Sequence, residues 1–161
     1  FGYLKEKFPE IIINKPDKNY QKNRTWFIPE KHDLSIFSNS IRFCDLNINL
    51  ASTVTLDSAV LDKPVINIAF SSNSKDRRSI RIPHYYESPH YKRVVEFGAT
   101  RIAFSMEELL KYVHMYLENP NLDKEKREIL RKELCGIDAK LSKDRIIDAI
   151  LKVLKEEKTS G

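Results

Sequence analysis

A short run of the sequence groups three hydroxyl side chains with one carboxylate: Ser52, Thr53, Thr55 and Asp57. The run follows an apolar segment that we predict as a strand, and it opens a predicted helix over residues 53–61. The first N–H groups of a helix and its positive dipole end favour anions. The pattern therefore indicates a phosphate-binding turn. A purely structural interpretation, in which Ser52 only caps the helix, stays open.

Asp57 and two further side chains, His90 and Trp26, extend this candidate site beyond the hydroxyl groups. Asp57 lies four residues after Thr53, so both share one helix face, and Asp57 can accept hydrogen bonds from sugar hydroxyls. A favourable charge near the helix N-terminus is the alternative explanation. His90 lies in a basic, aromatic stretch and can bind a phosphate or act as a general base, although spacing alone does not favour it over His84. Trp26 can stack on a base, or it can pack a loop against the core.

Other kinds of site find no support in the sequence. It has neither the glycine pattern of a dinucleotide fold nor that of a P-loop. No cluster of His, Cys, Asp and Glu has metal-ligand spacing. We therefore predict no metal and no cofactor.

The elements that must position these residues alternate between strands and helices. We expect strands at 10–14, 45–50, 65–70 and 101–104, with helices at 33–43, 53–61, 91–97, 105–118, 124–135 and 142–154. Residues 15–31 and 71–89 are expected to be long loops. Short apolar strands separated by helices predict a parallel sheet covered on both faces, which is a doubly wound α/β domain. The last three helices form a C-terminal helical tail.

Composition limits the class of protein. The chain has 161 residues, 41% of them hydrophobic and 32% charged, which fits one globular domain with a buried core. No stretch approaches the roughly 20 apolar residues of a membrane-spanning helix. The two cysteines form no disulfide framework, so we expect a reducing compartment. A net charge of +5 is too small to indicate a nucleic acid partner.

The basic residues are unevenly distributed. Residues 75–93 hold six of them: Lys75, Arg77, Arg78, Arg81, Lys92 and Arg93. This segment can face phosphates or anionic lipid heads, and a solvated loop is the alternative. The chain also opens with a helix-like turn at 3–8, without an initiator methionine. We therefore expect a fragment that lacks at least one upstream strand–helix unit.

Several segments together resemble GT-B glycosyltransferases. Residues 44–66, CDLNINLASTVTLDSAVLDKPVI, resemble that family's donor-site segment: an aspartate-led strand, a Ser/Thr-rich turn, a helix and then Lys-Pro-Val-Ile. Residues 89–99, 105–109, 116–120 and 135–146 resemble its later segments. The similarity covers about residues 10 to 154. It points most closely to transferases of surface polysaccharides and teichoic-acid-like polymers, including CDP-glycerol glycerophosphotransferase-like proteins.

The resemblance implies a Rossmann-like α/β domain that forms the C-terminal, donor-binding half of a two-domain enzyme. By position, Ser52, Thr53 and Thr55 would hold the donor pyrophosphate, Asp57 would contact the ribose or the donor sugar, and His90 would lie near the phosphates. No catalytic residue is assigned, because the base is expected from the missing N-terminal half. The fragment alone is expected to bind nucleotide weakly and not to turn over. Two departures are Ala139, where the family often has glycine, and the absence of the expected His-Pro or Arg-Pro-His strand.

The implied reaction moves a sugar or polyol phosphate from a nucleotide-activated donor, a nucleotide sugar or CDP-polyol, onto a cell-surface polymer or glycan. The expected location is the cytoplasm, with peripheral contact at the inner face of the cell membrane left open. Two alternatives remain. One is an enzyme half of the UDP-N-acetylglucosamine 2-epimerase type, although the expected Gly-rich turn and Glu-Glu pair near residues 52–58 are absent. The other is a non-catalytic nucleotide-binding or interaction module.

Overall fold

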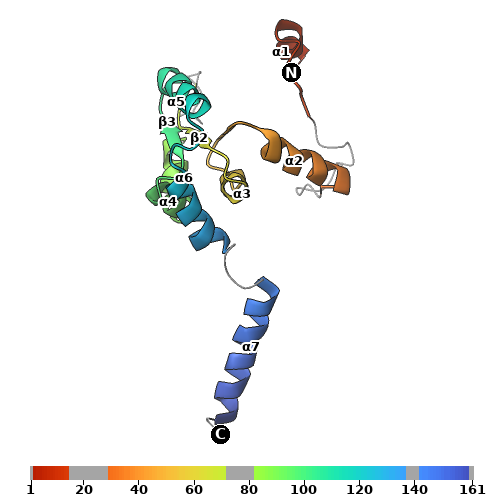
Figure 1. Ribbon diagram of the computed structural model, residues 1–161, viewed down its shortest axis with the longest axis vertical. Helices are drawn as coiled ribbons and strands as arrows, with labels where there is room; N and C mark the ends of the chain where they lie inside the picture. The colour runs from red at the N-terminus through yellow and green to blue at the C-terminus, as the bar shows by residue number, and fades with distance from the viewer. Residues whose placement is uncertain (1, 15–28, 72–81, 137–141, 160–161) are drawn as a thin grey trace. The chain divides into compact units, whose positions relative to one another are not determined.

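Three short strands form a parallel sheet in the computed structural model, which describes residues 2–14, 29–71, 82–136 and 142–159 (Figure 1). The strands are β1 (Asn47–Asn49), β2 (Val65–Ile68) and β3 (Arg101–Ala103), in this order across the sheet. The register places Asn49 beside Asn67, and Asn67 beside Ile102. All three strands therefore end at one edge, which we call the carboxyl edge.

Helices precede, connect and follow the strands. They are α1 (Gly2–Lys7), α2 (Lys31–Phe43), α3 (Val54–Val60), the 3-10 helix η2 (Pro83–Glu87), α4 (Pro89–Glu96), α5 (Met106–Glu118), α6 (Lys124–Leu130), the π-helix η3 (Arg131–Cys135) and α7 (Ser142–Thr159). Residues 1–40 and 41–161 form two compact units, and the sheet belongs to the second.

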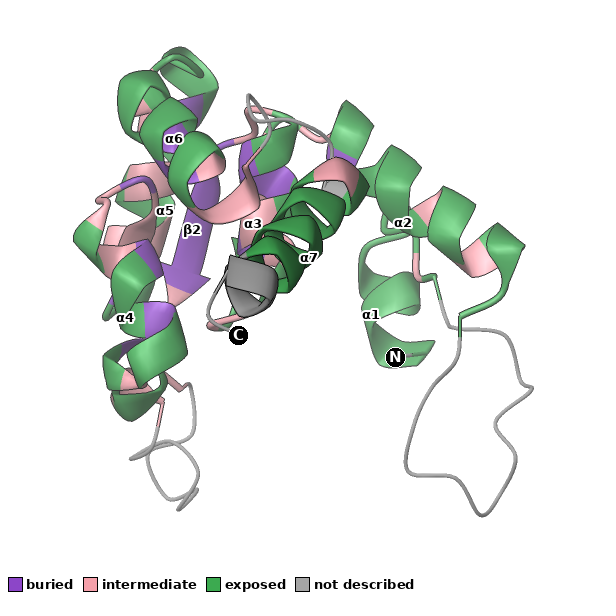
Figure 2. Ribbon diagram, turned by 90° about the horizontal axis from the view of Figure 1, so that it is seen from below, coloured by how far each residue is buried: buried purple, intermediate pink, exposed green. Residues whose placement is uncertain are grey.

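Two hydrophobic clusters bury the middle of the sheet. The first cluster gathers side chains from α3, η2, α4 and α6: Ala59, Ala69, Tyr86, Tyr91, Val94, Ala99 and Leu130. The second joins Ile66 and Ala103 to Tyr116 of α5. Because successive strand residues point to opposite faces, Ile66 and its neighbour Asn67 serve different sides of β2. Figure 2 shows β2 as largely buried.

A polar network holds α6 at the other edge of the sheet, where β3 begins. Arg127 is almost fully buried, and its Nε donates to Asp62 at 2.9 Å. Its other nitrogens donate to the Leu122 and Pro120 carbonyls at 2.6 and 3.0 Å. Arg101 Nε donates to Asp123 Oδ2 at 2.9 Å, and Arg101 Nη2 forms an ion pair with the same oxygen at 2.8 Å. These contacts fix the α5–α6 connection against α3 and β3.

Most predicted elements are confirmed, including the three strands of the sheet and a helix at each predicted position. The strand predicted at 10–14 is wrong, because residues 11–14 have no regular structure and Ile12 is 85% exposed. β-branched residues fit a pleated, half-buried surface, and their propensity alone does not form a strand. The parallel α/β sheet is compatible with a Rossmann-like fold. The doubly wound sheet stays a prediction.

The two predicted loops differ in outcome. The prediction of one continuous loop over residues 71–89 is wrong, because η2 begins at Pro83 and α4 begins at Pro89. Proline is favoured in the first turn of a helix, and the prediction did not use this signal. Within the segment 15–31, residues 15–28 lie outside the described residues, and Lys31 already belongs to α2. Ala139 also lies outside the described residues.

Candidate functional site

The turn between β1 and α3 forms the centre of the candidate site. Its Ala51 has a φ of +37°, a region that residues other than glycine rarely adopt. The half-buried Ser52 accepts a hydrogen bond from the Val54 N–H at 3.2 Å. Thr53 is exposed and makes no side-chain cap. Ser52 thus satisfies one helix N–H, and Thr53 presents its hydroxyl to solvent.

Thr55 differs from its neighbours and corrects the expectation from the sequence. Its side chain is fully buried, and its Oγ lies 2.8 Å from the Tyr91 hydroxyl and 3.2 Å from Asn49 Nδ2. A hydroxyl enclosed by protein partners is not accessible to a donor phosphate. The prediction that Thr55 binds the pyrophosphate is therefore wrong in this structure, and Thr55 belongs to the interior beneath the turn.

The bond between Thr55 and Tyr91 brings the beginnings of α3 and α4 together. Thr55 is the second residue of α3, and Tyr91 is the third residue of α4. Tyr91 also donates to Asn67 Oδ1 on β2 at 3.0 Å. His90, one residue earlier in α4, is exposed. The beginnings of α3 and α4, and with them the backbone positions of Ser52, Thr53 and His90, therefore lie at the carboxyl edge of the sheet.

A second tyrosine supports this edge from η2. Tyr86 donates to the Ile68 carbonyl at 2.6 Å, and its ring stands edge-on to Tyr91 with centroids 5.6 Å apart. Burial raises the pKa of Tyr86 to about 12, and a backbone hydrogen bond with Ala51 opposes the rise. Burial likewise raises the pKa of Tyr91, against the effect of its bonds to Thr55 and Asn67. Both phenols keep their protons at neutral pH.

The remaining predicted site residues lie apart from this edge or outside the described residues. Asp57 is exposed one turn further along α3. Burial raises the pKa of Cys135 in η3, and the negative charge of Asp57 raises it further. Trp26 lies outside the described residues, so its predicted stacking on a base stays a prediction.

An open pocket of about 560 Å³ adjoins the carboxyl edge beside β3. Its lining comes from η2, α4 and β3 with the residue that follows: Pro83, Tyr86, Glu87, Lys92, Val95, Glu96, Ile102 and Phe104. Pockets that hold small molecules commonly have this size. Because Tyr86 contributes both to this pocket and to the hydrogen bonds at the edge, the pocket and the candidate site are neighbours.

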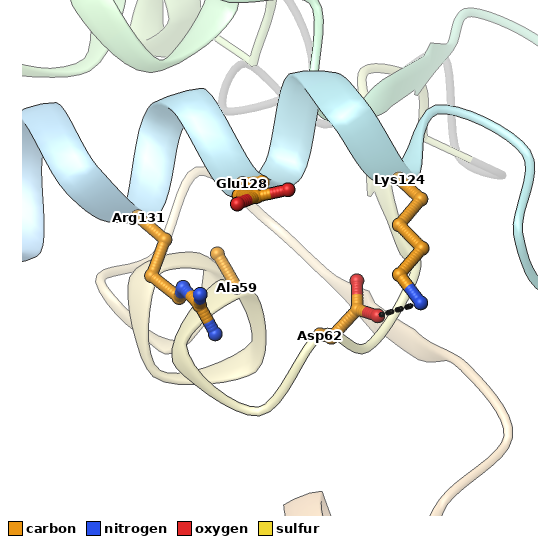
Figure 3. Close-up of a pocket in the computed structure, with 5 residues that line it drawn as sticks. All are labelled: Ala59, Asp62, Lys124, Glu128 and Arg131. Carbon is orange, nitrogen blue, oxygen red and sulfur yellow. Dashed lines mark ion pairs between the residues drawn. The ribbon is translucent and has the colours of Figure 1, made fainter. Parts of the chain in front are cut away.

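A smaller pocket lies near the opposite end of α3. Figure 3 shows its lining residues: Ala59, Asp62, Lys124, Glu128 and Arg131. Lys124 and Asp62 form an ion pair of 3.5 Å at one side of it. A volume of about 50 Å³ suits a water molecule rather than a nucleotide. This pocket is therefore no alternative donor site.

Sequence reasoning missed the residues that hold the site from beneath: Asn49, Asn67, Tyr86 and Tyr91. A signal was present for the two asparagines. Each occupies a predicted strand position that should hold an apolar side chain, and the parallel register makes them neighbours. The two tyrosines carried no comparable signal, because their partners lie 18 to 36 residues away.

Two kinds of feature, metal-binding groups and membrane-spanning helices, were considered for the part of the chain that the structure describes. Among residues 2–14, 29–71, 82–136 and 142–159, no group of three or more His, Cys, Asp or Glu side chains could hold a metal ion. None of the helices in this part of the chain has the length and apolar character that crossing a membrane requires. Comparison of the chain with models of protein families, with curated proteins and with solved structures finds no match.

Proposed function

We propose that this chain binds the phosphates of a nucleotide-activated donor at the carboxyl edge of its sheet, as the donor-binding domain of a GT-B-type transferase. One observation carries the proposal. The 2.8 Å contact between Thr55 and Tyr91 unites the beginnings of α3 and α4 at the edge where ligands of open α/β sheets bind. Ser52 and Thr53 precede α3, and His90 is the second residue of α4, which supports a shared role for the three in binding phosphate.

The chemistry of this edge suits an anion. The free N–H groups at the beginning of a helix are hydrogen-bond donors with a partial positive charge. Thr53 adds an exposed hydroxyl, and His90 adds an imidazole on the neighbouring helix. Fixed donors of this kind stabilise the charge that develops on a departing nucleotide without reorganising. Asp57, one turn further along α3, is the acceptor that we propose for hydroxyls of the ribose or donor sugar.

The proposed reaction transfers a sugar or polyol phosphate from the nucleotide to a cell-surface polymer or glycan. The edge described above provides donor binding and stabilises the leaving group. We propose that the general base and the acceptor site come from a second domain. We also propose that the reaction takes place in the cytoplasm.

Calorimetric titration with UDP, CDP and GDP and with their sugar or polyol conjugates tests the proposal. We expect binding of one nucleotide class. Replacing both Ser52 and Thr53 with alanine should weaken that binding about tenfold or more, because hydrogen bonds to a charged group are lost. Ser38→Ala, at an exposed position of α2, is the matched control and should bind like the wild type. Absence of heat with all three nucleotide classes, or unchanged affinity in the double variant, would contradict the proposal.

A further inference from the structure

We propose that Thr55 and Tyr91 are positioning residues: a buried chain of hydrogen bonds through their hydroxyls fixes the beginnings of α3 and α4 relative to each other, and so sets the affinity of the carboxyl edge for phosphate. The inference rests on the proposed function, and it goes further by giving a role to two residues that a bound phosphate would not touch.

The direction of the hydrogen bonds follows from counting protons. A hydroxyl has one hydrogen to donate. With the Tyr91 hydrogen on Asn67 Oδ1, Thr55 is the donor in the 2.8 Å contact between the two hydroxyls, and this shorter contact takes precedence over the 3.4 Å contact from Thr55 to Asn49 Oδ1. The Thr55 oxygen then accepts from Asn49 Nδ2 at 3.2 Å. Donation therefore runs in one direction, from β1 through α3 and α4 to β2.

Burial makes this chain of hydrogen bonds geometrically well defined. The side chains of Thr55 and Asn67 are fully buried, and Tyr91 is nearly so. In a region of low dielectric constant each bond strengthens its neighbours. Removal of the Tyr91 hydroxyl takes the donor from Asn67 Oδ1, and removal of the Thr55 hydroxyl takes one partner each from Tyr91 and Asn49. A valine at position 55 would fill nearly the same space, so close packing alone does not require a hydroxyl there. What the hydroxyl adds is a fixed distance between two helices.

The chain of hydrogen bonds supports the turn between β1 and α3. Ala51, with its φ of +37°, lies immediately before Ser52 and Thr53. A residue held in an uncommon backbone conformation persists only when its surroundings determine it. Asn49, at the start of this turn, is tied to Thr55, and Ala51 packs against the hydrophobic cluster that contains Tyr86 and Tyr91. The turn is therefore held from both sides by residues of the network.

Four variants of the whole chain test the inference. Thr55→Val and Tyr91→Phe each remove one hydroxyl and keep the shape. Thr55→Ser restores the hydroxyl, and Tyr85→Phe changes an exposed tyrosine of η2 as a matched control. The readouts are the affinity for CDP, UDP and GDP by calorimetry, the amide chemical shifts of Ser52 and Thr53 by NMR, and stability in urea.

We expect Thr55→Val and Tyr91→Phe each to weaken nucleotide binding about tenfold and to shift the Ser52 and Thr53 amides. Thr55→Ser should stay within about twofold of the wild type, and Tyr85→Phe should not differ from it. The double variant Thr55→Val/Tyr91→Phe should lose no more affinity than either single variant, because each already breaks the same chain.

The outcomes separate this inference from the proposed function. If the wild type binds none of the three nucleotides, the proposed function fails, and the amide shifts still decide whether the chain positions the turn. If Thr55→Val and Tyr91→Phe reduce stability but leave affinity and both amide shifts unchanged, the residues are only structural and the inference is overturned. If Thr55→Val does not fold, Tyr91→Phe decides by the same criteria, because it keeps the ring that packs against Tyr86.

Discussion

Arg127 shows at the scale of a single residue how a buried charge is accommodated. Its guanidinium donates to three acceptors, namely the Asp62 carboxylate and the carbonyls of Leu122 and Pro120. We expect Arg127→Ala to lower the free energy of unfolding by about 2–3 kcal/mol, because the two carbonyls lose their donors. The loss is smaller than for a fully buried pair, since the Asp62 side chain is 39% exposed and stays hydrated. Urea unfolding measures it.

The control for this prediction is Lys124→Ala. Lys124 also pairs with Asp62, at 3.5 Å, but both side chains are substantially exposed. Exposed pairs contribute about 0–1 kcal/mol. An equal loss in Arg127→Ala and Lys124→Ala would contradict the role given to the buried guanidinium.

Asp123 should make the free energy of unfolding depend on pH in acidic solution. Burial alone raises the pKa of Asp123, but hydrogen bonds and charge from Arg101, with bonds from Tyr116 and Lys126, lower it below its usual value. A carboxylate with a lowered folded-state pKa stabilises the fold above its unfolded pKa of about 3.9, and this contribution is lost as the pH falls further. We expect the difference in unfolding free energy between wild type and Asp123→Asn to be constant near neutral pH and to shrink below about pH 4. Urea titrations between pH 2.5 and 7, taken at about half-unit steps, check this, and a difference independent of pH would contradict it.

Local sequence patterns predicted an element well where the interaction that forms the element is itself between residues close in sequence. The beginning of α5 is an example, because Ser105 accepts a hydrogen bond from the Glu108 N–H at 3.1 Å, as the capping pattern indicates. Glu108 bonds the N–H of Phe104 rather than that of Ser105. The prediction of a strand at residues 10–14 was wrong because β-propensity was its only support.

The cap of α5 gives a prediction at this scale. Ser105→Ala should lower the free energy of unfolding by about 1 kcal/mol, because the Glu108 N–H loses its acceptor. Thermal or urea unfolding measures the change. Ser105→Asp, which keeps an acceptor at the same position, should restore most of the stability, and an equal loss in both variants would show that the cap is unimportant.

The candidate site was predictable only in part. The hydroxyl run at residues 52–55 could be located from sequence, because a strand–turn–helix pattern is local. Which hydroxyls face solvent could not be predicted, because Thr55 is buried through a partner 36 positions away. Tyr91 and Asn67 were missed for the same reason. Their hydrogen bond joins residues far apart in sequence, and neither residue belongs to a recognisable local motif.

The division into two units allows a prediction for the whole molecule. In the described part of residues 1–30, every side chain is exposed except Ile13, which is partly exposed. Burial of apolar surface is the main source of stability, and the residues of both hydrophobic clusters belong to the unit 41–161. We expect deletion of residues 1–30 to leave the urea midpoint of the sheet unit nearly unchanged. A clear fall in the midpoint would show that these residues support the second unit.

The high pKa values of Tyr86 and Tyr91 have a consequence for how ligand binding should respond to acidity. Phenols whose pKa is raised, to about 12 for Tyr86, keep their hydrogens over the whole range in which proteins normally remain folded. The support beneath the turn therefore keeps one pattern of donors and acceptors from mildly acidic to mildly alkaline solution. Any pH dependence of the proposed nucleotide binding across that range must therefore originate outside the two tyrosines beneath the turn.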